Sequence, residues 1–219
     1  MSPSTADATR AALLSAAERL FAERGIDGVS LREINRESGA RNAVAIQYHF
    51  DDRAGVVQAI LAKHRDDIEA RRHALLDQYE AAGVADLRTL VGALVRPQAA
   101  KLADPDGGPE YLQIQADLFN RPQPEVDGQE QSDDDMSDST NRWRALVAPL
   151  IDPEAVRLHR RFTAILHCAV ELGRRARSGP HTDDRLFTSY LVDVVTAILA
   201  APVSDETSRL ATERDRARR

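Results

Sequence analysis

The chain has 219 residues, of which 42% are hydrophobic, a formal net charge of −6 and a single cysteine, Cys168. This length accommodates a small domain followed by a larger one, and a lone cysteine excludes an intrachain disulfide. No apolar run approaches the length of a membrane span and no signal segment opens the chain, so we expect a soluble cytoplasmic protein without a membrane partner.

The acidic balance is not spread evenly along the chain. Residues 1–65 contain nine Lys/Arg and eight Asp/Glu, whereas the remaining residues contain twenty and twenty-seven. Attraction to phosphate depends on local charge, because salt screens charges beyond about 10 Å. The net charge therefore does not exclude a nucleic-acid partner for the N-terminal part.

Three N-terminal helices are predicted, the last two joined by a glycine turn. The first spans about Asp7 to Arg24 and presents one apolar stripe: Leu13, Ala17, Leu20 and Phe21. Ser30 and Glu33 have the spacing of a capping box that starts a second short helix. Gly39 then allows a sharp turn into a third helix from about Arg41 to Tyr48, with Val44 facing inward.

This outline is typical of a helix-turn-helix DNA reader. Arginine bonds guanine bidentately in the major groove, and asparagine or glutamine does the same for adenine. Residues at the end of the third helix and just beyond it are placed to reach phosphates. The candidate DNA-contacting residues are Ser30, Arg32, Arg41, Asn42, Gln47, Tyr48, His49 and Arg53.

The segment from Arg10 to Ile60 resembles the N-terminal domain of the TetR family of transcriptional regulators. The resemblance is carried by AALLSAAERLFAERGIDGVSLREI, by the Gly39 turn and by YHFDDRAGVVQAI. Two departures are that the stretch from Gly39 to Phe50 is one residue longer than the commonest pattern, and that Gln47 stands where many members carry a tyrosine. The resemblance implies a DNA-binding domain at residues 1–52, a larger helical ligand-binding and dimerisation domain at 53–203, and a charged tail at 204–219.

The rest of the chain also has a helical pattern, so the predicted fold class is all-α. A long helix follows Asp51 and Asp52 and runs to about Glu80, with a polar middle, KHRDDIEARRH, that predicts a solvated connection between domains. Asp86 is placed to cap the next helix, which Pro97 bends or ends, and Pro109 suits the first turn of another. Residues 121–140, rich in acids and prolines, predict a mobile loop. Asp152 then caps a helix that runs to Gly173 or Gly179, and a last large helix opens at 182–184.

The last two long helices carry more apolar positions than one narrow stripe needs, which favours a partner surface. By resemblance, this pair meets its two-fold mate in a homodimer. A monomeric bundle stays open. The candidate interface residues are Phe162, Ile165, Ala169, Leu172, Leu191, Val194, Val195 and Ile198.

The resemblance also implies a small-molecule effector pocket in the larger domain. Amphipathic placement gives Tyr111, Gln115, Phe119, Trp143, Phe162 and His167 as candidate lining residues, and each fits a plain core position equally well. Few basic residues fall on the inward faces, so an apolar or aromatic effector is favoured over an anionic one.

Catalysis is not predicted. His64, His73, His159, His167 and Cys168 are the candidates, but adjacent residues point about 100° apart on a helix, so His167 and Cys168 make a poor nucleophile pair. The sequence shows no phosphate loop and no zinc motif, so neither a metal nor a cofactor is expected. We therefore expect a homodimeric repressor that binds a near-palindromic DNA operator and is released by a small molecule. The alternatives are a DNA-binding activator, or a helical protein-interaction module that does not bind DNA.

Overall fold

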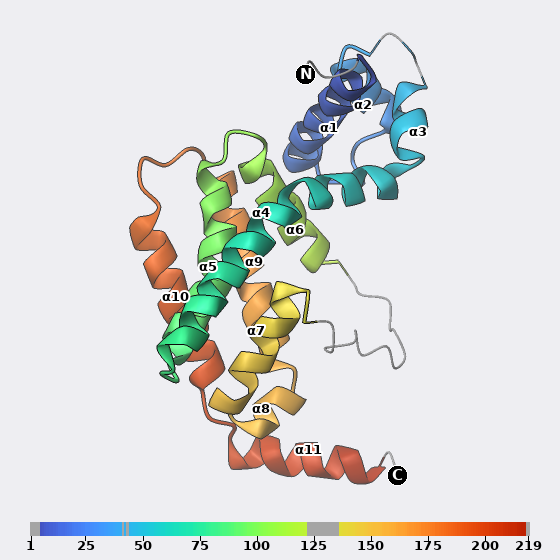
Figure 1. Cartoon of the computed structure of the whole chain (residues 1–219). Coiled ribbons are helices and arrows are strands. Elements are labelled where there is room, and N and C mark those ends of the chain that lie inside the picture. The colour runs from blue at the N-terminus through green and yellow to red at the C-terminus, as the bar shows by residue number, and fades with distance from the viewer. Residues whose placement is uncertain (1–4, 41, 43, 122–135, 218–219) are drawn as a thin grey trace. The chain divides into compact units, whose positions relative to one another are not determined.

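The computed structural model describes residues 5–40, 42, 44–121 and 136–217. Every element in this described part is a helix, which confirms the all-α prediction. Figure 1 shows their arrangement. The α-helices are α1 (Thr5–Arg24), α2 (Leu31–Glu37), α3 (Ala45–Phe50), α4 (Arg53–Ala82), α5 (Leu87–Ala99), α6 (Gly108–Phe119), α7 (Ser139–Val147), α8 (Pro153–Arg157), α9 (Arg160–Arg177), α10 (Arg185–Ala200) and α11 (Asp205–Ala217). Two short 3₁₀ helices, η1 (Ala100–Ala103) and η2 (Ala148–Leu150), follow α5 and α7.

The helices form two compact units that interleave along the chain. Unit 1 comprises Met1–Ala70, Pro97–Pro124 and Ala169–Asp184, and unit 2 comprises Arg71–Arg96, Glu125–Cys168 and Arg185–Arg219. The helices α4, α5 and α9 each contribute residues to both units. The domains predicted at 1–52, 53–203 and 204–219 divide the chain consecutively, and they stay a prediction.

Unit 1 contains the three N-terminal helices, which gather around one apolar core. Leu13 and Phe21 of α1, Ile34 of α2, and Ile46 and Phe50 of α3 are all buried. Figure 1 shows α1, α2 and α3 side by side, with α4 leaving the end of α3. The helix α6 of the same unit packs against α1.

Four predicted helix caps are confirmed. Ser30 and Glu33 form the capping box at α2, and the Asp52 carboxylate accepts the Gly55 N–H at 2.8 Å at the start of α4. The Asp152 carboxylate accepts the Glu154 N–H at 2.8 Å before α8. Asp86 likewise accepts the Thr89 N–H at 2.9 Å before α5. These caps could be predicted because the capping side chain and the N–H group that it accepts lie within a few residues of each other in the sequence.

Two helix boundaries differ from the prediction. The third helix begins at Ala45 instead of about Arg41, and Val44 is exposed instead of facing inward. The helix expected to run on from Asp152 is broken between α8 and α9, where His159 adopts a left-handed φ of 57°. A left-handed histidine interrupts helical hydrogen bonding, and no local pattern announces it. Of the predicted loop at 121–140, residues 122–135 lie outside the described part.

The middle of α4 is not the solvated connection that its composition predicted. His64, Ile68 and Arg72, spaced four residues apart on one face, are all buried. In unit 2, Arg72 Nη1 donates to Ser139 Oγ at 2.8 Å and to Thr140 Oγ1 at 3.0 Å. Burial of charged side chains here depends on partners distant in sequence, which a local reading of KHRDDIEARRH does not show.

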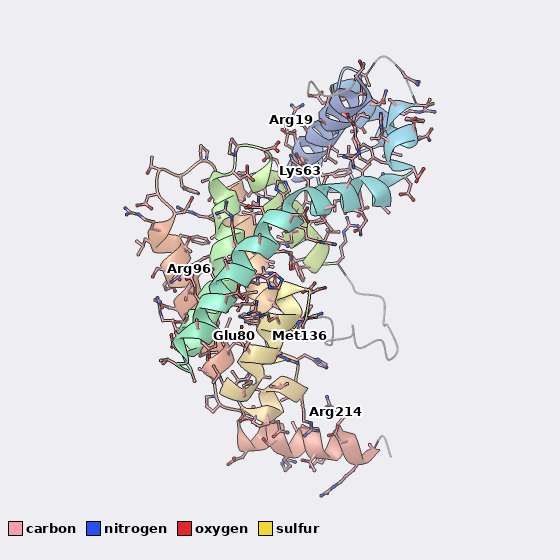
Figure 2. All side chains as sticks on the ribbon, in the orientation of Figure 1. Arg19, Lys63, Glu80, Arg96, Met136 and Arg214 are labelled. Atoms are coloured by element: carbon pink, nitrogen blue, oxygen red, sulfur yellow. The ribbon has the colours of Figure 1, made fainter. Side chains whose placement is uncertain are left out.

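Unit 2 is organised around Trp143 of α7. Its indole is fully buried, and Nε1 donates to the Leu90 carbonyl of α5 at 2.8 Å. Near the end of α4, where Figure 2 labels Glu80, the Arg142 guanidinium forms ion pairs with Asp77 and Glu80. Burial raises the pKa of the Cys168 thiol to about 12, so this side chain stays a neutral thiol near neutral pH.

No single helix of the described residues is long and apolar enough to cross a membrane. Only taken together do α10 and α11 meet that criterion of length and composition, and they are bent by 60° at the break between them.

Candidate nucleic-acid interface

One side of α3 and of the residue before it faces outward. Val44, Gln47 and Tyr48, at positions i, i+3 and i+4, are exposed, Val44 to 53% and Tyr48 to 81%. The opposite side, formed by Ala45, Ile46 and Phe50, is buried against unit 1. We call the three exposed residues the α3 outer face. Gln47 was predicted to point outward and Tyr48 to reach phosphates, whereas Val44 was predicted to face inward.

The segment that leads into α3 is held by side-chain amides. Asn35 of α2 is buried, and its Nδ2 donates to the Asn42 carbonyl at 2.9 Å while its Oδ1 accepts the Ile46 N–H at 3.3 Å. Asn42 Oδ1 in turn accepts the Val44 N–H at 3.1 Å. Asn35 therefore fixes α3 relative to α2, a positioning role that sequence reasoning missed. The only signal for it was a polar residue beside Ile34 on the inward side of a short helix.

Asn42 is exposed, as predicted, but its oxygen already has a partner. A bidentate contact with adenine uses both the amide oxygen and the amide nitrogen. Because Oδ1 accepts the Val44 N–H, that contact would have to share the oxygen or break this bond. Arg41, the other predicted base reader beside it, lies outside the described residues.

Ser30 serves the start of α2. Its backbone N–H donates to Glu33 Oε2 at 2.8 Å, and its hydroxyl donates to the same oxygen at 2.7 Å. These two bonds, together with Arg24 Nη1 at 3.0 Å from the other oxygen, lower the pKa of Glu33 to about 2. Arg32, on the same helix, is exposed. Direct DNA contact by Ser30 or Arg32 stays a prediction.

Two of the side chains predicted to contact phosphate, Arg53 and His49, already make contacts within unit 1. Arg53 Nη2 donates to the Val29 carbonyl at 2.9 Å, and its Nη1 lies 3.7 Å from Asp27 Oδ1. The His49 ring is half-buried and lies edge-on to Tyr48, with ring centroids 5.1 Å apart. The guanidinium of Arg53 thus has a hydrogen-bond partner within unit 1, the Val29 carbonyl. A contact of Arg53 with phosphate stays a prediction.

The α3 outer face offers groups that suit base edges. The major groove admits an α-helix, and a glutamine amide can both donate to and accept from adenine there. A tyrosine hydroxyl suits phosphate or base. The capped α2, the Gly39 turn at φ +70° and the short α3 together have the form of a helix-turn-helix.

The six predicted effector-lining residues are divided between the units. Tyr111, Gln115 and Phe119 belong to unit 1, and Trp143, Phe162 and His167 belong to unit 2. Tyr111 is buried, its hydroxyl accepts from Gln115 Nε2 at 2.9 Å, and its ring lies 4.6 Å from that of His64. Phe119 and His167 are half-buried, and Phe162 is exposed. The effector pocket stays a prediction.

Two basic residues of the described part are nevertheless buried, outside the helices that carry the predicted pocket residues. They are Arg72 and Lys101. Lys101 Nζ lies 2.9 Å from Asp67 Oδ2 and 3.0 Å from Asp104 Oδ2, so the buried ammonium is paired with two carboxylates. An apolar or aromatic effector stays a prediction.

The predicted dimer residues fall into two groups. Ala169, Leu172, Leu191 and Val195 are already buried within the single chain. Their apolar periodicity is the same for a core and for an interface, and the dimer interface stays a prediction. Ile165, Val194 and Ile198 are half-buried, and Phe162 is exposed. Leu186 and Tyr190, one turn apart on α10, are exposed and were not among the predicted interface residues.

Comparison with known proteins identifies the N-terminal helices. The family model described as "Bacterial regulatory proteins, tetR family" matches residues 13–60. Over 57 residues the chain is 40% identical to the HTH-type transcriptional repressor BepR of Brucella suis biovar 1 (strain 1330). That segment covers 26% of this chain and 27% of the relative, so the likeness is confined to about a quarter of each. Residues 13–60 of this chain are therefore similar to the N-terminal part of the tetR family of bacterial regulatory proteins.

Proposed function

We propose that this chain is a non-catalytic transcriptional regulator of the cytoplasm that inserts the α3 outer face into the major groove of DNA. The observation that carries the proposal is the exposure of Val44, Gln47 and Tyr48 on one side of a helix whose other side is buried. The TetR-type match at residues 13–60 supports it. A recognition helix needs just this combination of an anchored side and an outward side.

The proposed regulator is a homodimer on a near-palindromic operator. One short helix reads only a few base pairs, so two-fold symmetry doubles the contacts. The exposed apolar side chains Leu186 and Tyr190 of α10, together with Phe162 of α9, support a partner surface in unit 2. A Leu186→Glu and Tyr190→Glu variant should sediment as a monomer where the wild type sediments as a dimer. Equal sedimentation of the two proteins would reject this interface.

The proposed outcome of binding is repression, because the matched relative is named as a transcriptional repressor. Release by a small-molecule effector requires the effector to prefer the conformation that does not bind DNA. An apolar or aromatic effector is the proposed class. A reporter gene behind the selected operator, in cells with and without the protein, distinguishes repression from activation by the sign of the change.

The deciding experiment measures DNA binding directly. A duplex is selected from a random library with the full-length chain, and its affinity is measured by fluorescence anisotropy. Arg41→Ala with Gln47→Ala should weaken binding at least tenfold, since each bidentate base contact is worth about 1–3 kcal/mol. The control is Gln78→Ala with Arg96→Ala, which removes two exposed side chains of unit 2, and helical content is checked by circular dichroism.

The salt dependence of the same affinity provides an independent test. Phosphate contacts release counterions, so the logarithm of the association constant should fall linearly with the logarithm of salt concentration. A flat salt dependence, or a double variant that binds as tightly as wild type, would favour a protein-interaction module instead.

A further inference from the structure

Unit 1 exposes large hydrophobic side chains in one place only within its described residues. These are Val44 and Tyr48, and both lie on the α3 outer face. Tyrosine carries a hydroxyl that accounts for its exposure at a polar interface. Val44 has no polar group, yet 53% of it is open to solvent. Its exposure at the beginning of the proposed recognition helix therefore calls for an apolar partner.

The backbone holds Val44 on both sides. Its N–H donates to Asn42 Oδ1 at 3.1 Å, and its carbonyl accepts the Tyr48 N–H at 3.1 Å. The side chain is β-branched, so rotation about χ1 is restricted. The two γ-methyl groups thus have few orientations open to them, and Gln47 lies three residues further along the same exposed side.

The major groove contains one apolar group that distinguishes a base, the C5 methyl of thymine. We propose that Val44 reads a thymine methyl in each half of the operator. Val44 is then a specificity-determining residue that contacts a base without a hydrogen bond. This inference rests on the proposed function, since it assigns a base to one residue of the α3 outer face.

The expected size of the effect follows from the burial of one methyl group. Burial of a methyl or methylene contributes enough to change an equilibrium constant by about fourfold. A dimer reads two half-sites, so loss of both methyl contacts should weaken binding by about fifteenfold. Per half-site, this change of about fourfold is smaller than the loss of about fivefold or more expected from removal of one bidentate base contact, so the complex stays measurable.

The experiment removes the C5 methyl of thymine from the DNA and, separately, the γ-methyl groups of Val44 from the protein. Each thymine of the selected duplex is replaced singly, and in symmetric pairs, by deoxyuridine, which keeps the pairing groups and lacks only the methyl. The proteins are wild type, Val44→Ala, and the control Val84→Ala, which changes a valine of unit 2 that is 65% exposed. Gln47→Ala is included as a second variant of the α3 outer face.

One thymine in each half-site should show a penalty of about fourfold for deoxyuridine with wild type and with Val84→Ala. Val44→Ala should bind the thymine and deoxyuridine duplexes equally. Gln47→Ala should bind both more weakly while it keeps the penalty at that thymine. Because Val44 is exposed, the alanine variant is expected to fold, and a wild-type scan in which no deoxyuridine weakens binding overturns the inference by itself.

Three results overturn the inference while the proposed function stands: half-sites without thymine, wild-type binding that ignores every deoxyuridine, or a full penalty retained in Val44→Ala. The last two would leave Val44 exposed for another partner, such as a protein. Failure of the proposed function is seen on the unmodified duplex, as absence of any selected sequence or as unchanged binding by Arg41→Ala with Gln47→Ala. That result overturns this inference as well.

Discussion

The Lys63 ammonium donates to both carboxylate oxygens of Glu18, at 2.9 and 3.1 Å. Glu18 of α1 is only 2% exposed, and Lys63 of α4 also donates to Asp106, before α6, at 2.9 Å. His64 Nε2 lies 3.2 Å from Glu18 Oε1. Figure 2 labels Lys63 on α4 beside α1. The buried carboxylate of Glu18 thus links α1 to α4 within unit 1.

Removal of this carboxylate should destabilise the protein. Glu18→Ala leaves Lys63 and His64 without their buried partner, and breaking a buried pair costs about 3 kcal/mol of unfolding free energy. Urea unfolding, followed by circular dichroism, measures the loss. The matched control is Arg19→Ala, because Arg19 pairs with Glu37 at 3.3 Å on the exposed side of the same helix. That change should cost less than about 1 kcal/mol. Equal losses of unfolding free energy in the two variants would show that the buried Glu18 contacts stabilise the protein no more than an exposed ion pair does.

Lys63 titrates above its ordinary range. Burial alone would lower its pKa, but hydrogen bonds with Asp106 and Glu18 outweigh burial and raise the pKa of Lys63. A raised pKa contributes stability that is present below the unfolded-state pKa of about 10.4 and is lost as pH rises through the folded-state pKa. Unfolding free energy should therefore fall above about pH 10.5, and Lys63→Met should reduce that fall. An unchanged alkaline limb in the variant would assign it to other groups.

Gly107, the residue before α6, should not tolerate a side chain. It has φ +80°, and a Cβ there would lie 2.4 Å from Glu18 Oε2. Gly107→Ala therefore combines the left-handed strain of about 1–2 kcal/mol with displacement of the buried carboxylate. Gly25→Ala is the control, because Gly25 has φ +76° and nothing within 4 Å of the added Cβ. Thermal unfolding should show the larger loss for Gly107→Ala, and similar losses would mean that Glu18 moves aside at little cost.

Local chemistry explains what could be predicted from the sequence. The Ser30–Glu33 capping box and the Asp152 cap each satisfy backbone groups within three residues, so their spacing alone identifies them. The Gly39 turn follows from the positive φ that glycine tolerates. The same short-range signals gave the outward placement of Gln47.

What could not be predicted depends on partners far along the chain. Glu18 is buried because Lys63 and His64, some 45 residues away, hold it. Arg72 is buried with Ser139, 67 residues away. Val44 is exposed because α3 starts only at Ala45, where Asn35 of another helix accepts the Ile46 N–H.

Acid should weaken the start of α2. The backbone N–H and hydroxyl of Ser30, with Arg24, lower the pKa of Glu33 to about 2. A lowered carboxyl pKa contributes stability that is present above the unfolded-state pKa, about 4.3, and is lost as pH falls toward 2. The midpoint of thermal unfolding should fall between pH 4.5 and 2, and Glu33→Gln should fall less over that range. If both proteins lose stability equally, the acid limb belongs to other carboxylates.

Asn35 should control DNA binding without touching DNA. Its amide donates to the Asn42 carbonyl at 2.9 Å and accepts the Ile46 N–H at 3.3 Å, so it sets the position of the α3 outer face. Asn35→Asp keeps the acceptor but directs a second oxygen at the Asn42 carbonyl, which should cost about 1–3 kcal/mol of stability. Affinity for the selected duplex should fall about tenfold, because base contacts require fixed geometry. The control is Asn120→Asp, since Asn120 makes the same kind of bond, to Ala116 at 2.9 Å, on an exposed helix end. If Asn35→Asp lowers stability and leaves affinity intact, α3 is positioned by its buried apolar side, and the amide only satisfies the backbone.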